Sequence, residues 1–218
     1  MVKQLIVTAD DFGLHPDFNH GILEAVMYRK VNAVSVMIDR RIIPDWQINI
    51  LKNEYSRVGL HLDLGKRREW TKYSESDKEK KVSNQIHIFE NTFDFLPDHI
   101  DGHYNVHLED KTVFDYVVKY AKEHKTYVRG RGVDIEKLKN LSVKTCDHFH
   151  NSLEEEPAKL LENAKDGVNE LMLHPGFYYR DTEYPTSLTD GRQRDLDFLL
   201  SKEFEKLLKK HNIELMEF

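Results

Sequence analysis

The sequence has a single cysteine, Cys146, among 218 residues. One thiol cannot form a disulfide within the chain, and it cannot supply the paired cysteines of a structural zinc motif. The cysteine count therefore excludes both the disulfide-framework and the cysteine-zinc classes of protein. We expect Cys146 to be an ordinary buried thiol.

Long apolar segments are missing as well. No run of 18 apolar residues occurs, so the sequence predicts no transmembrane helix. A strand-like segment begins almost at once, at Lys3 to Val7, and no charged region followed by a long apolar stretch resembles a signal peptide. We expect a cytoplasmic protein with no membrane partner.

An excess of positive charge is also absent. The chain carries 32 Lys and Arg residues against 38 Asp and Glu residues, a formal net charge of −6. Nucleic-acid binding requires basic residues clustered on one face, so no nucleic-acid partner is expected. A neutral or cationic small substrate fits this charge better. Hydrophobic residues make up 39% of the chain and charged residues 32%, which is typical of a globular protein.

The chain alternates short β-branched apolar runs with segments of helical period, and neither a repeat nor a low-complexity segment divides it. The expected strands are Gln4–Val7, Ala33–Ile38, Val58–Leu60, His99–Ile100, Thr126–Val128, Glu170–Leu173 and Ile213–Met216. The expected helices are Phe18–Arg29, Asp45–Glu54, Lys78–Phe95, Asp110–His124, Leu153–Ala164 and Asp190–Lys210. This alternation predicts one α/β domain over residues 1–218, built as either an open doubly wound parallel sheet or a closed barrel.

Two segments lack both periods. Lys66 to Ser83 is polar and charged, which predicts either a lid over the strand ends or a solvated loop with no role. The second, Phe177 to Thr189, is rich in Tyr, Pro and Asp and follows the strand that ends at His174. It is predicted to be a loop at the same end of the sheet.

Two adjacent acids, Asp10 and Asp11, follow the first apolar run. Adjacent carboxylates repel one another, so such a pair indicates a nearby cation or access to solvent. Taken alone, the pair is most simply an exposed turn, with Gly13 supplying a relaxed backbone. The histidines further along the chain favour a different interpretation.

His61, His103 and His174 also follow apolar runs. In parallel α/β folds, functional groups gather at the carboxyl ends of the strands. A single histidine in such a place is more often a hydrogen-bonded structural residue than a ligand. Several histidines together with two acids favour a functional site instead.

One carboxylate and two imidazoles hold a divalent ion and leave positions open for water and substrate. We predict that Asp11, His61 and His103 are these ligands. Asp10 is then the candidate base that takes a proton from water, and His174 is the candidate acid that protonates the leaving group. This ligand set suits zinc, cobalt, nickel or iron, whereas magnesium normally prefers more oxygen ligands.

Four further residues are candidates for binding substrate or orienting a ligand: Asp63, Asp101, His107 and Arg129. Asp63 and Asp101 either orient a ligand or fix a turn. Arg129 either pairs with the candidate base and holds it ionised or is an exposed loop arginine. His107 either lines the pocket or orients a ligand. The remaining histidines are expected on helices or loops without comparable context: His15, His20, His87, His124, His148, His150 and His211.

At these residues the chain resembles the YdjC-like carbohydrate deacetylase family, which includes the chitooligosaccharide deacetylases. The matching motifs are Ala9-Asp10-Asp11-Phe12-Gly13, Gly59-Leu60-His61-Leu62, Asp101-Gly102-His103-Tyr104-Asn105-Val106-His107, Val128-Arg129, His174-Pro175-Gly176 and the segment Ile213 to Phe218. Their order and number, rather than any single motif, make the resemblance specific. Gly102, Tyr104 and Asn105 depart from the third family motif, and Asp63 is an acid where members more often carry a neutral residue.

The resemblance implies a distorted TIM-type (β/α) barrel and metal-dependent removal of N-acetyl groups from amino sugars or short chitooligosaccharides. By that likeness Asp11, His61 and His103 match the metal ligands, Asp10 the base and His174 the acid. It implies one divalent ion, Mg²⁺ or Zn²⁺ with Co²⁺ as an alternative, and a small N-acetylated sugar as substrate. A homodimer is compatible with it. Two other functions stay open: a metal-dependent phosphoesterase or other amidohydrolase, and a catalytically silent sugar-binding protein.

Overall fold

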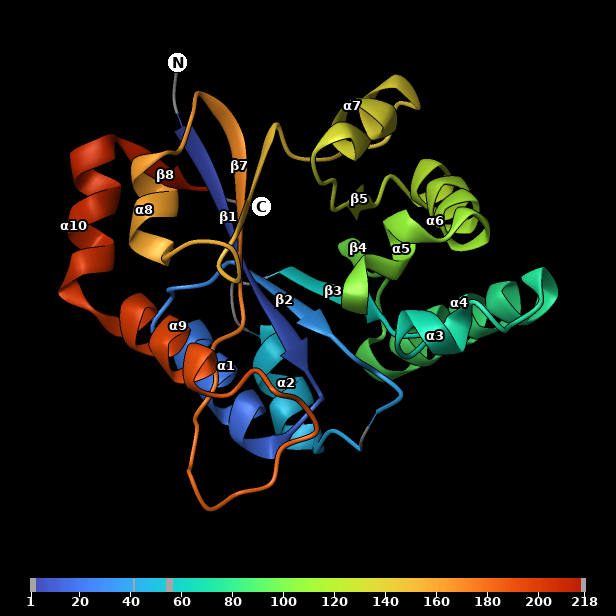
Figure 1. The fold of residues 1–218 in the computed structure, drawn as a ribbon, viewed down its shortest axis with the longest axis horizontal. Coiled ribbons are helices and arrows are strands. Elements are labelled where there is room, and N and C mark those ends of the chain that lie inside the picture. Colours follow the sequence, from blue (N-terminus) through green and yellow to red (C-terminus); the bar gives the residue numbers. More distant parts are fainter. Residues whose placement is uncertain (1–2, 41, 54–56, 217–218) are drawn as a thin grey trace.

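The computed structural model describes residues 3–40, 42–53 and 57–216, and it places one parallel sheet at the centre of the molecule (Figure 1). The strands follow the order β5-β4-β3-β2-β1-β7-β6, and β8 also pairs with β1. Their bounds are β1 (Lys3–Phe12), β2 (Ala33–Val36), β3 (Arg57–Leu62), β4 (His99–Gly102), β5 (Tyr127–Val128), β6 (His148–Asn151), β7 (Gly167–Leu173) and β8 (Ile213–Leu215). Every pairing between these strands is parallel.

The sheet curls into an incomplete barrel. Glu170 of β7 accepts a hydrogen bond from the Tyr127 hydroxyl of β5 at 2.5 Å, although several strands separate β7 from β5 in the sheet. Val128 N of β5 donates a backbone hydrogen bond at 2.9 Å to Lys144 O, in the segment that leads into β6. The predicted distorted barrel is therefore confirmed, and the open doubly wound sheet is wrong.

Side chains alternate along β1 between the core and the barrel interior, as the period of a strand requires. Leu5, Val7 and Ala9 belong to the hydrophobic core. Thr8 points the other way and donates to Glu170 across the barrel at 3.1 Å. The interior is therefore polar, and it leads toward the carboxyl ends of the strands.

Helices cover the outside of the barrel (Figure 1). They are α1 (Pro16–Met27), α2 (Asp45–Asn53), α3 (Arg67–Trp70), α4 (Glu75–Phe93), α5 (Val106–Glu109), α6 (Lys111–His124), α7 (Val133–Asn140), α8 (Pro157–Glu162), α9 (Asp190–Leu200) and α10 (Lys202–His211), with a 3₁₀ turn η1 (His103–Asn105). Local signals start several of them: Ser74 caps α4 by accepting from Asp77 N, and Asp110 caps α6 by accepting from Thr112 N. Among the described helices, none combines the length and apolar character needed to cross a bilayer.

Several predicted boundaries need correction. Lys66 to Ser83 is not a loop, because it contains α3 and the first turns of α4. The single predicted helix Asp190–Lys210 is two helices, separated where Ser201 caps α10. His148 and His150 lie on β6 rather than on a helix or loop. The end of the predicted helix at Glu54 and the last two residues of Ile213 to Phe218 fall outside the described residues.

Candidate active site

Asp10 and Asp11 lie inside β1 near its carboxyl end, and neither is in an exposed turn, because each is 1% exposed. The pairing of β1 with β2 shifts register between Ala9 and Phe12, and Asp11 has a φ of 70°. A regular strand sends neighbouring side chains to opposite faces, but an irregularity of this kind re-aims one of them. Both acids consequently join the same polar cluster.

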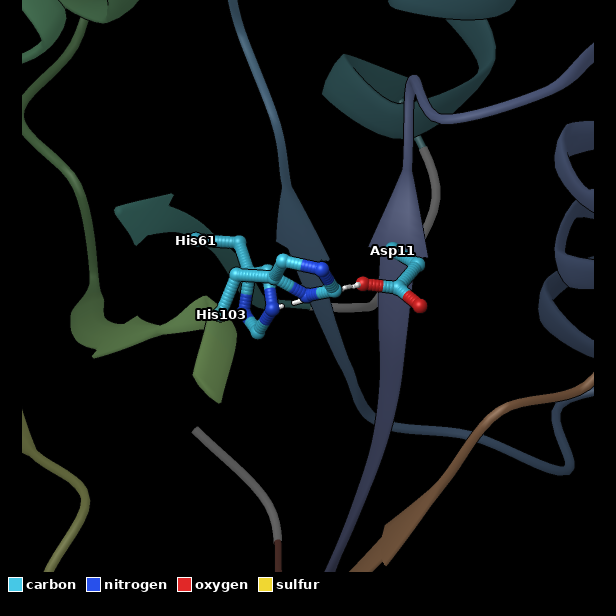
Figure 2. Close-up of side chains that lie close together, drawn as sticks. All are labelled: Asp11, His61 and His103. Atoms are coloured by element: carbon cyan, nitrogen blue, oxygen red, sulfur yellow. Dashed lines mark ion pairs between the residues drawn. The ribbon is translucent and has the colours of Figure 1, made fainter. Parts of the chain in front are cut away.

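The three predicted metal ligands are brought together (Figure 2). Asp11 Oδ1 lies 3.4 Å from His61 Nε2 and 3.3 Å from His103 Nδ1. One ligand atom from each residue lies within 4.8 Å of the others. Asp11 Oδ1 is buried and has no hydrogen-bond partner among the described residues. An unpartnered buried carboxylate oxygen between two imidazoles fits a divalent cation.

A second acid fixes the orientation of the His61 ring. Asp101 Oδ1 lies 2.7 Å from His61 Nδ1 and also accepts the Ser35 hydroxyl. Burial lowers the pKa of His61, but Asp101 and Asp10 outweigh it and raise that pKa well above its usual value. With Nδ1 directed at Asp101, Nε2 faces Asp11, which is the arrangement of a carboxylate–histidine–metal unit. A cation bound at Nε2 takes the place of the proton that Asp101 and Asp10 otherwise stabilise on His61.

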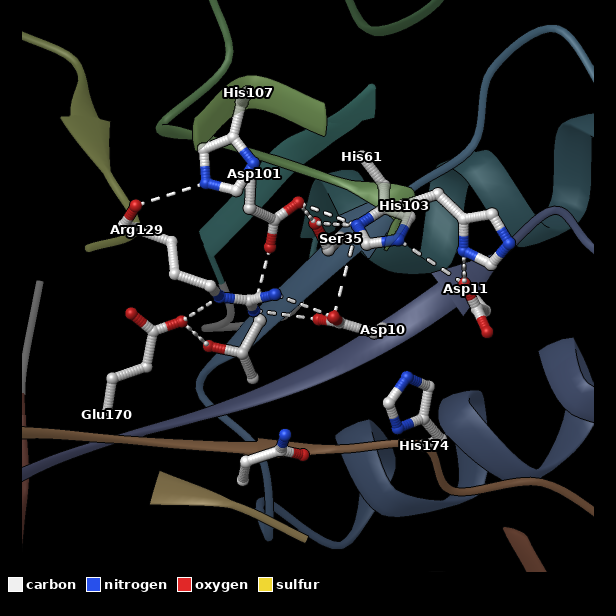
Figure 3. A network of polar contacts seen from close by, with 12 residues as sticks. Asp10, Asp11, Ser35, His61, Asp101, His103, His107, Arg129, Glu170 and His174 are labelled. Carbon is white, nitrogen blue, oxygen red and sulfur yellow. Dashed lines mark hydrogen bonds and ion pairs between the residues drawn. The ribbon is translucent and has the colours of Figure 1, made fainter. Parts of the chain in front are cut away.

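Arg129 connects the acids of the cluster and is buried, so it is not an exposed loop arginine (Figure 3). Its Nη1 and Nη2 atoms donate to the two oxygens of Asp10 at 2.7 and 2.8 Å. Its Nε donates to Glu170 at 2.7 Å, and Nη2 lies 2.7 Å from Asp101 Oδ2. The predicted pairing of Arg129 with Asp10 is therefore present, and it is bidentate.

The cluster has an excess of negative charge. Four buried carboxylates belong to it, and two buried guanidinium groups contact them: Asp10, Asp11, Asp101 and Glu170, with Arg129 and Arg192. Carboxylates outnumber guanidinium groups by two, and a proton on His61, whose pKa is raised, balances part of that excess when no metal is bound. Because buried charge is costly without a partner, a divalent cation in place of that proton fits the charge of this network.

His174 follows β7 and approaches the cluster from that side (Figure 3). Its backbone N–H donates to Asp195 Oδ2 at 2.9 Å, and its buried Nδ1 has no hydrogen-bond partner among the described residues. Burial lowers the pKa of His174, while the charges of Asp11 and Asp10 act in the opposite direction. The ring is therefore available to exchange a proton.

Two predicted residues support the site from outside the metal-ligand group. His107 Nε2 lies 3.1 Å from Arg129 O, and burial lowers the pKa of His107 to about 4. Asp63 pairs with Arg40 and accepts from Gly65 N at 2.8 Å, so its observed contacts stabilise the turn after β3. Of the two alternatives for Asp63, these contacts match the turn.

Four residues of the site are missing from the predictions: Ser35, Glu170, Arg192 and Asp195. Glu170 had a usable signal, because an acid inside the apolar run of β7 has to face a polar partner. Arg192 had none. It belongs to the polar helix α9, where the sequence does not distinguish it from the neighbouring Arg194.

The family model for YdjC-like proteins matches residues 4–210. The chain belongs to the YdjC-like family. The resemblance predicted from the motifs is thereby confirmed, and it extends over nearly the whole chain. This YdjC-like chain also shares sequence with proteins named carbohydrate deacetylase and chitooligosaccharide deacetylase.

A carbohydrate deacetylase from Clostridium beijerinckii is 30% identical over 243 residues, covering 99% of this chain and 98% of that protein. A chitooligosaccharide deacetylase from Serratia marcescens is 29% identical over 145 residues, or 56% of this chain and 57% of that protein.

Solved structures show the same fold. A putative cellobiose-phosphate cleavage protein from Enterococcus faecalis has a TM-score of 0.82 at 20% identity, covering 100% of this chain and 98% of that one. A family 4 carbohydrate esterase from Streptomyces lividans, in complex with acetate, has a TM-score of 0.61 at 10% identity, covering 98% and 91%. At such identities these likenesses concern the fold alone, the distorted barrel described above.

Proposed function

We propose that this protein is a metal-dependent carbohydrate deacetylase that removes N-acetyl groups from amino sugars or short chitooligosaccharides. The observation that carries the proposal is the buried Oδ1 of Asp11, which makes no hydrogen bond but lies close to His61 and His103 and beside the arginine-held Asp10. The names of the sequence relatives supply the substrate class.

Asp11, His61 and His103 would hold the ion. Two imidazoles and one carboxylate suit Zn²⁺ or Co²⁺ better than Mg²⁺, which prefers more oxygen ligands. When bound, a divalent ion supplies Lewis acidity, lowering the pKa of water and polarising the acetyl carbonyl. The proposed proton transfers are carried out by the side chains around the ion.

Asp10 is the proposed base. The bidentate contact from Arg129 fixes the plane of its carboxylate. An oxygen of Asp10 takes a proton from the attacking water. Arg129 is itself held by Glu170 and Asp101, so Asp10 is positioned before substrate arrives.

His174 is the proposed acid. Its ring faces the cluster from β7, opposite the strands that carry the two histidine ligands (Figure 3). Burial lowers the pKa of His174, and the opposing charges of Asp11 and Asp10 do not reverse this shift, so the ring gains its proton during the reaction before it acts as the acid. The imidazolium protonates the sugar amine as the amide C–N bond breaks, which makes the amine a better leaving group.

Acetate release from N-acetylglucosamine and its short oligomers tests the proposal. Metal-stripped protein, reloaded in turn with Zn²⁺, Co²⁺ or Mg²⁺, is expected to regain activity. Asp10→Asn is expected to lower kcat by about 10²–10⁴-fold, the usual contribution of a general base, while metal binding is retained. Asp110→Asn is the matched control, because Asp110 is a buried acid that caps α6 away from the cluster.

Two results would contradict the proposal. Hydrolysis of phosphate esters without acetate release would indicate a phosphoesterase, although Arg129 and Arg192 already pair with carboxylates. Binding of amino sugars without turnover by any metal-loaded form would indicate a silent binding protein.

A further inference from the structure

Arg192, on the first turn of α9, contacts the carboxylate oxygen of Asp11 that faces away from the two histidines. Its Nη2 lies 2.5 Å from Asp11 Oδ2, whereas both histidine nitrogens face Oδ1. The arginine is 1% exposed. The two oxygens of Asp11 therefore have separate partners, one cationic side chain and one pair of imidazoles.

The guanidinium of Arg192 is held rigidly in this position. Its Nε donates to Leu188 O at 3.1 Å, and its Cζ lies 4.0 Å from the centroid of the Phe18 ring. Its Nη1 is buried and has no hydrogen-bond partner among the described residues. A buried arginine with an unsatisfied donor is costly, so the contact with Asp11 needs a functional reason.

Two of the proposed ligands, His61 and Asp11, each contact a charged side chain, and these two side chains have opposite charges. Behind His61 is the carboxylate of Asp101, which makes the imidazole a stronger donor. Behind Asp11 is a guanidinium, which draws electron density from the carboxylate and repels a nearby cation. The two partners should therefore change metal affinity in opposite directions.

We infer that Arg192 is a positioning residue that limits Asp11 to one ligating oxygen and weakens its hold on the ion. An oxygen engaged with a guanidinium is withheld from the ion, so ligand positions stay open for water and substrate. This inference rests on the proposed metal site of the deacetylase, but it concerns the ion rather than the sugar.

The same helix also holds the candidate acid. Arg192 O accepts from Gly176 N at 3.2 Å, two residues after His174. Asp195, one turn further along α9, accepts from His174 N at 2.9 Å. A shift of α9 would thus move Asp11 and His174 together, so Arg192 links a proposed metal ligand to the proposed acid.

Metal affinity of purified full-length protein tests the inference, measured for Zn²⁺ by competition with a chromophoric chelator. The neutral variants Arg192→Gln and Arg192→Met are expected to bind Zn²⁺ about tenfold or more tightly than the unmodified protein. Arg192→Lys keeps the positive charge and should stay near the original affinity. Asp101→Asn is the reference of opposite sign, with an expected loss of about 10–100-fold.

The visible absorption of the Co²⁺-loaded proteins reports the coordination directly. Both neutral variants should change the intensity of the d–d bands, because Asp11 gains its second oxygen as a ligand, whereas Arg192→Lys should not. Neutral variants that are folded and bind Zn²⁺ with unchanged or weaker affinity overturn the inference. If the unmodified protein binds no divalent ion, both this inference and the proposed function fail. If the unmodified protein binds the ion but the Arg192 variants do not change its affinity as expected, only this inference fails and the proposed function stands.

Discussion

Three buried histidines other than the two metal-ligand candidates have lowered pKa values: His99, His107 and His174. Burial is the largest cause in each case, because an imidazolium loses more hydration than a neutral ring. His107 is the best defined of the three, with a pKa lowered to about 4 from the usual 6.5. A neutral histidine in the folded state makes stability depend on pH.

The sign of that dependence follows from proton binding. Between pH 6.5 and 4 the unfolded chain protonates His107 and the folded protein does not, so the free energy of unfolding falls as pH falls. The contribution of neutral His107 to the free energy of unfolding is fully present above pH 6.5, and roughly 3 kcal/mol is lost once the pH has fallen below about 4. His107→Gln should flatten this slope in urea unfolding between pH 7 and 4.5. Exposed His20→Gln is the control, and equal slopes for the two variants would contradict the prediction.

The site residues were predictable to the extent that strand ends are visible in sequence. Apolar runs precede Asp11, His61 and His103, and parallel strands bring their carboxyl ends together. The sequence does not predict Arg192, because a surface-like helix gives no sign that one of its arginines turns inward. Nor does it predict that Asp10 and Asp11 face the same way, since this depends on the irregular backbone of β1.

At the level of elements, α1 and the segment after β7 meet backbone to backbone. A Cβ atom added to Gly21 would lie 2.6 Å from Gly176 Cα and 2.9 Å from Phe177 N. Phe177 N also donates to Asp17 O of α1 at 3.2 Å. This close approach fixes the segment that begins at His174, and only glycine permits it.

Gly21→Ala should therefore impair activity more than folding. Alanine favours a helix over glycine by about 1 kcal/mol, but its methyl group displaces the segment that carries His174. We expect kcat to fall roughly 10–100-fold, as for small misplacements of a catalytic group, with unchanged Zn²⁺ affinity. Glu24→Ala on the same helix is the control. Full acetate release by Gly21→Ala would contradict the expected displacement.

Elements with a clear apolar period were predictable and short polar ones were not. β6 reads His-Phe-His-Asn and has no fully buried residue, so no apolar run marks it. α3 has only four residues, and α4 has a polar first half, which together resemble a loop in sequence. In both cases the neighbouring strands and helices, rather than the local residues, determine the structure.

For the molecule as a whole, the unbalanced charge of the buried network links the ion to stability. A ligand that binds only the folded protein adds about 2.7 kcal/mol at one hundred times its Kd. For a chain of this length that corresponds to a rise in Tm of roughly 5–10 °C. Zn²⁺ added to stripped protein should produce this rise, measured by calorimetry. Asp11→Asn should show little of it, and an equal rise in both proteins would place the ion elsewhere.

The alternation of strands and helices predicts parallel strands, but it does not distinguish a barrel from an open sheet. That choice depends on long-range contacts such as the one between Tyr127 and Glu170, which no local pattern encodes. The position of β8 beside the start of β1 is equally invisible in sequence.

The central place of β1 has a consequence for the order in which the chain can fold during synthesis. β1 is synthesised before the other strands of the sheet and can pair with β2 soon afterwards. Its other edge stays unpaired until β7 is made, since Thr8 and its partner Glu170 are 162 residues apart. Until then a nascent chain exposes an unpaired apolar edge, the feature through which incomplete proteins associate with one another. The strand that carries both acids of the active site is thus also the one whose completion the growing chain must await.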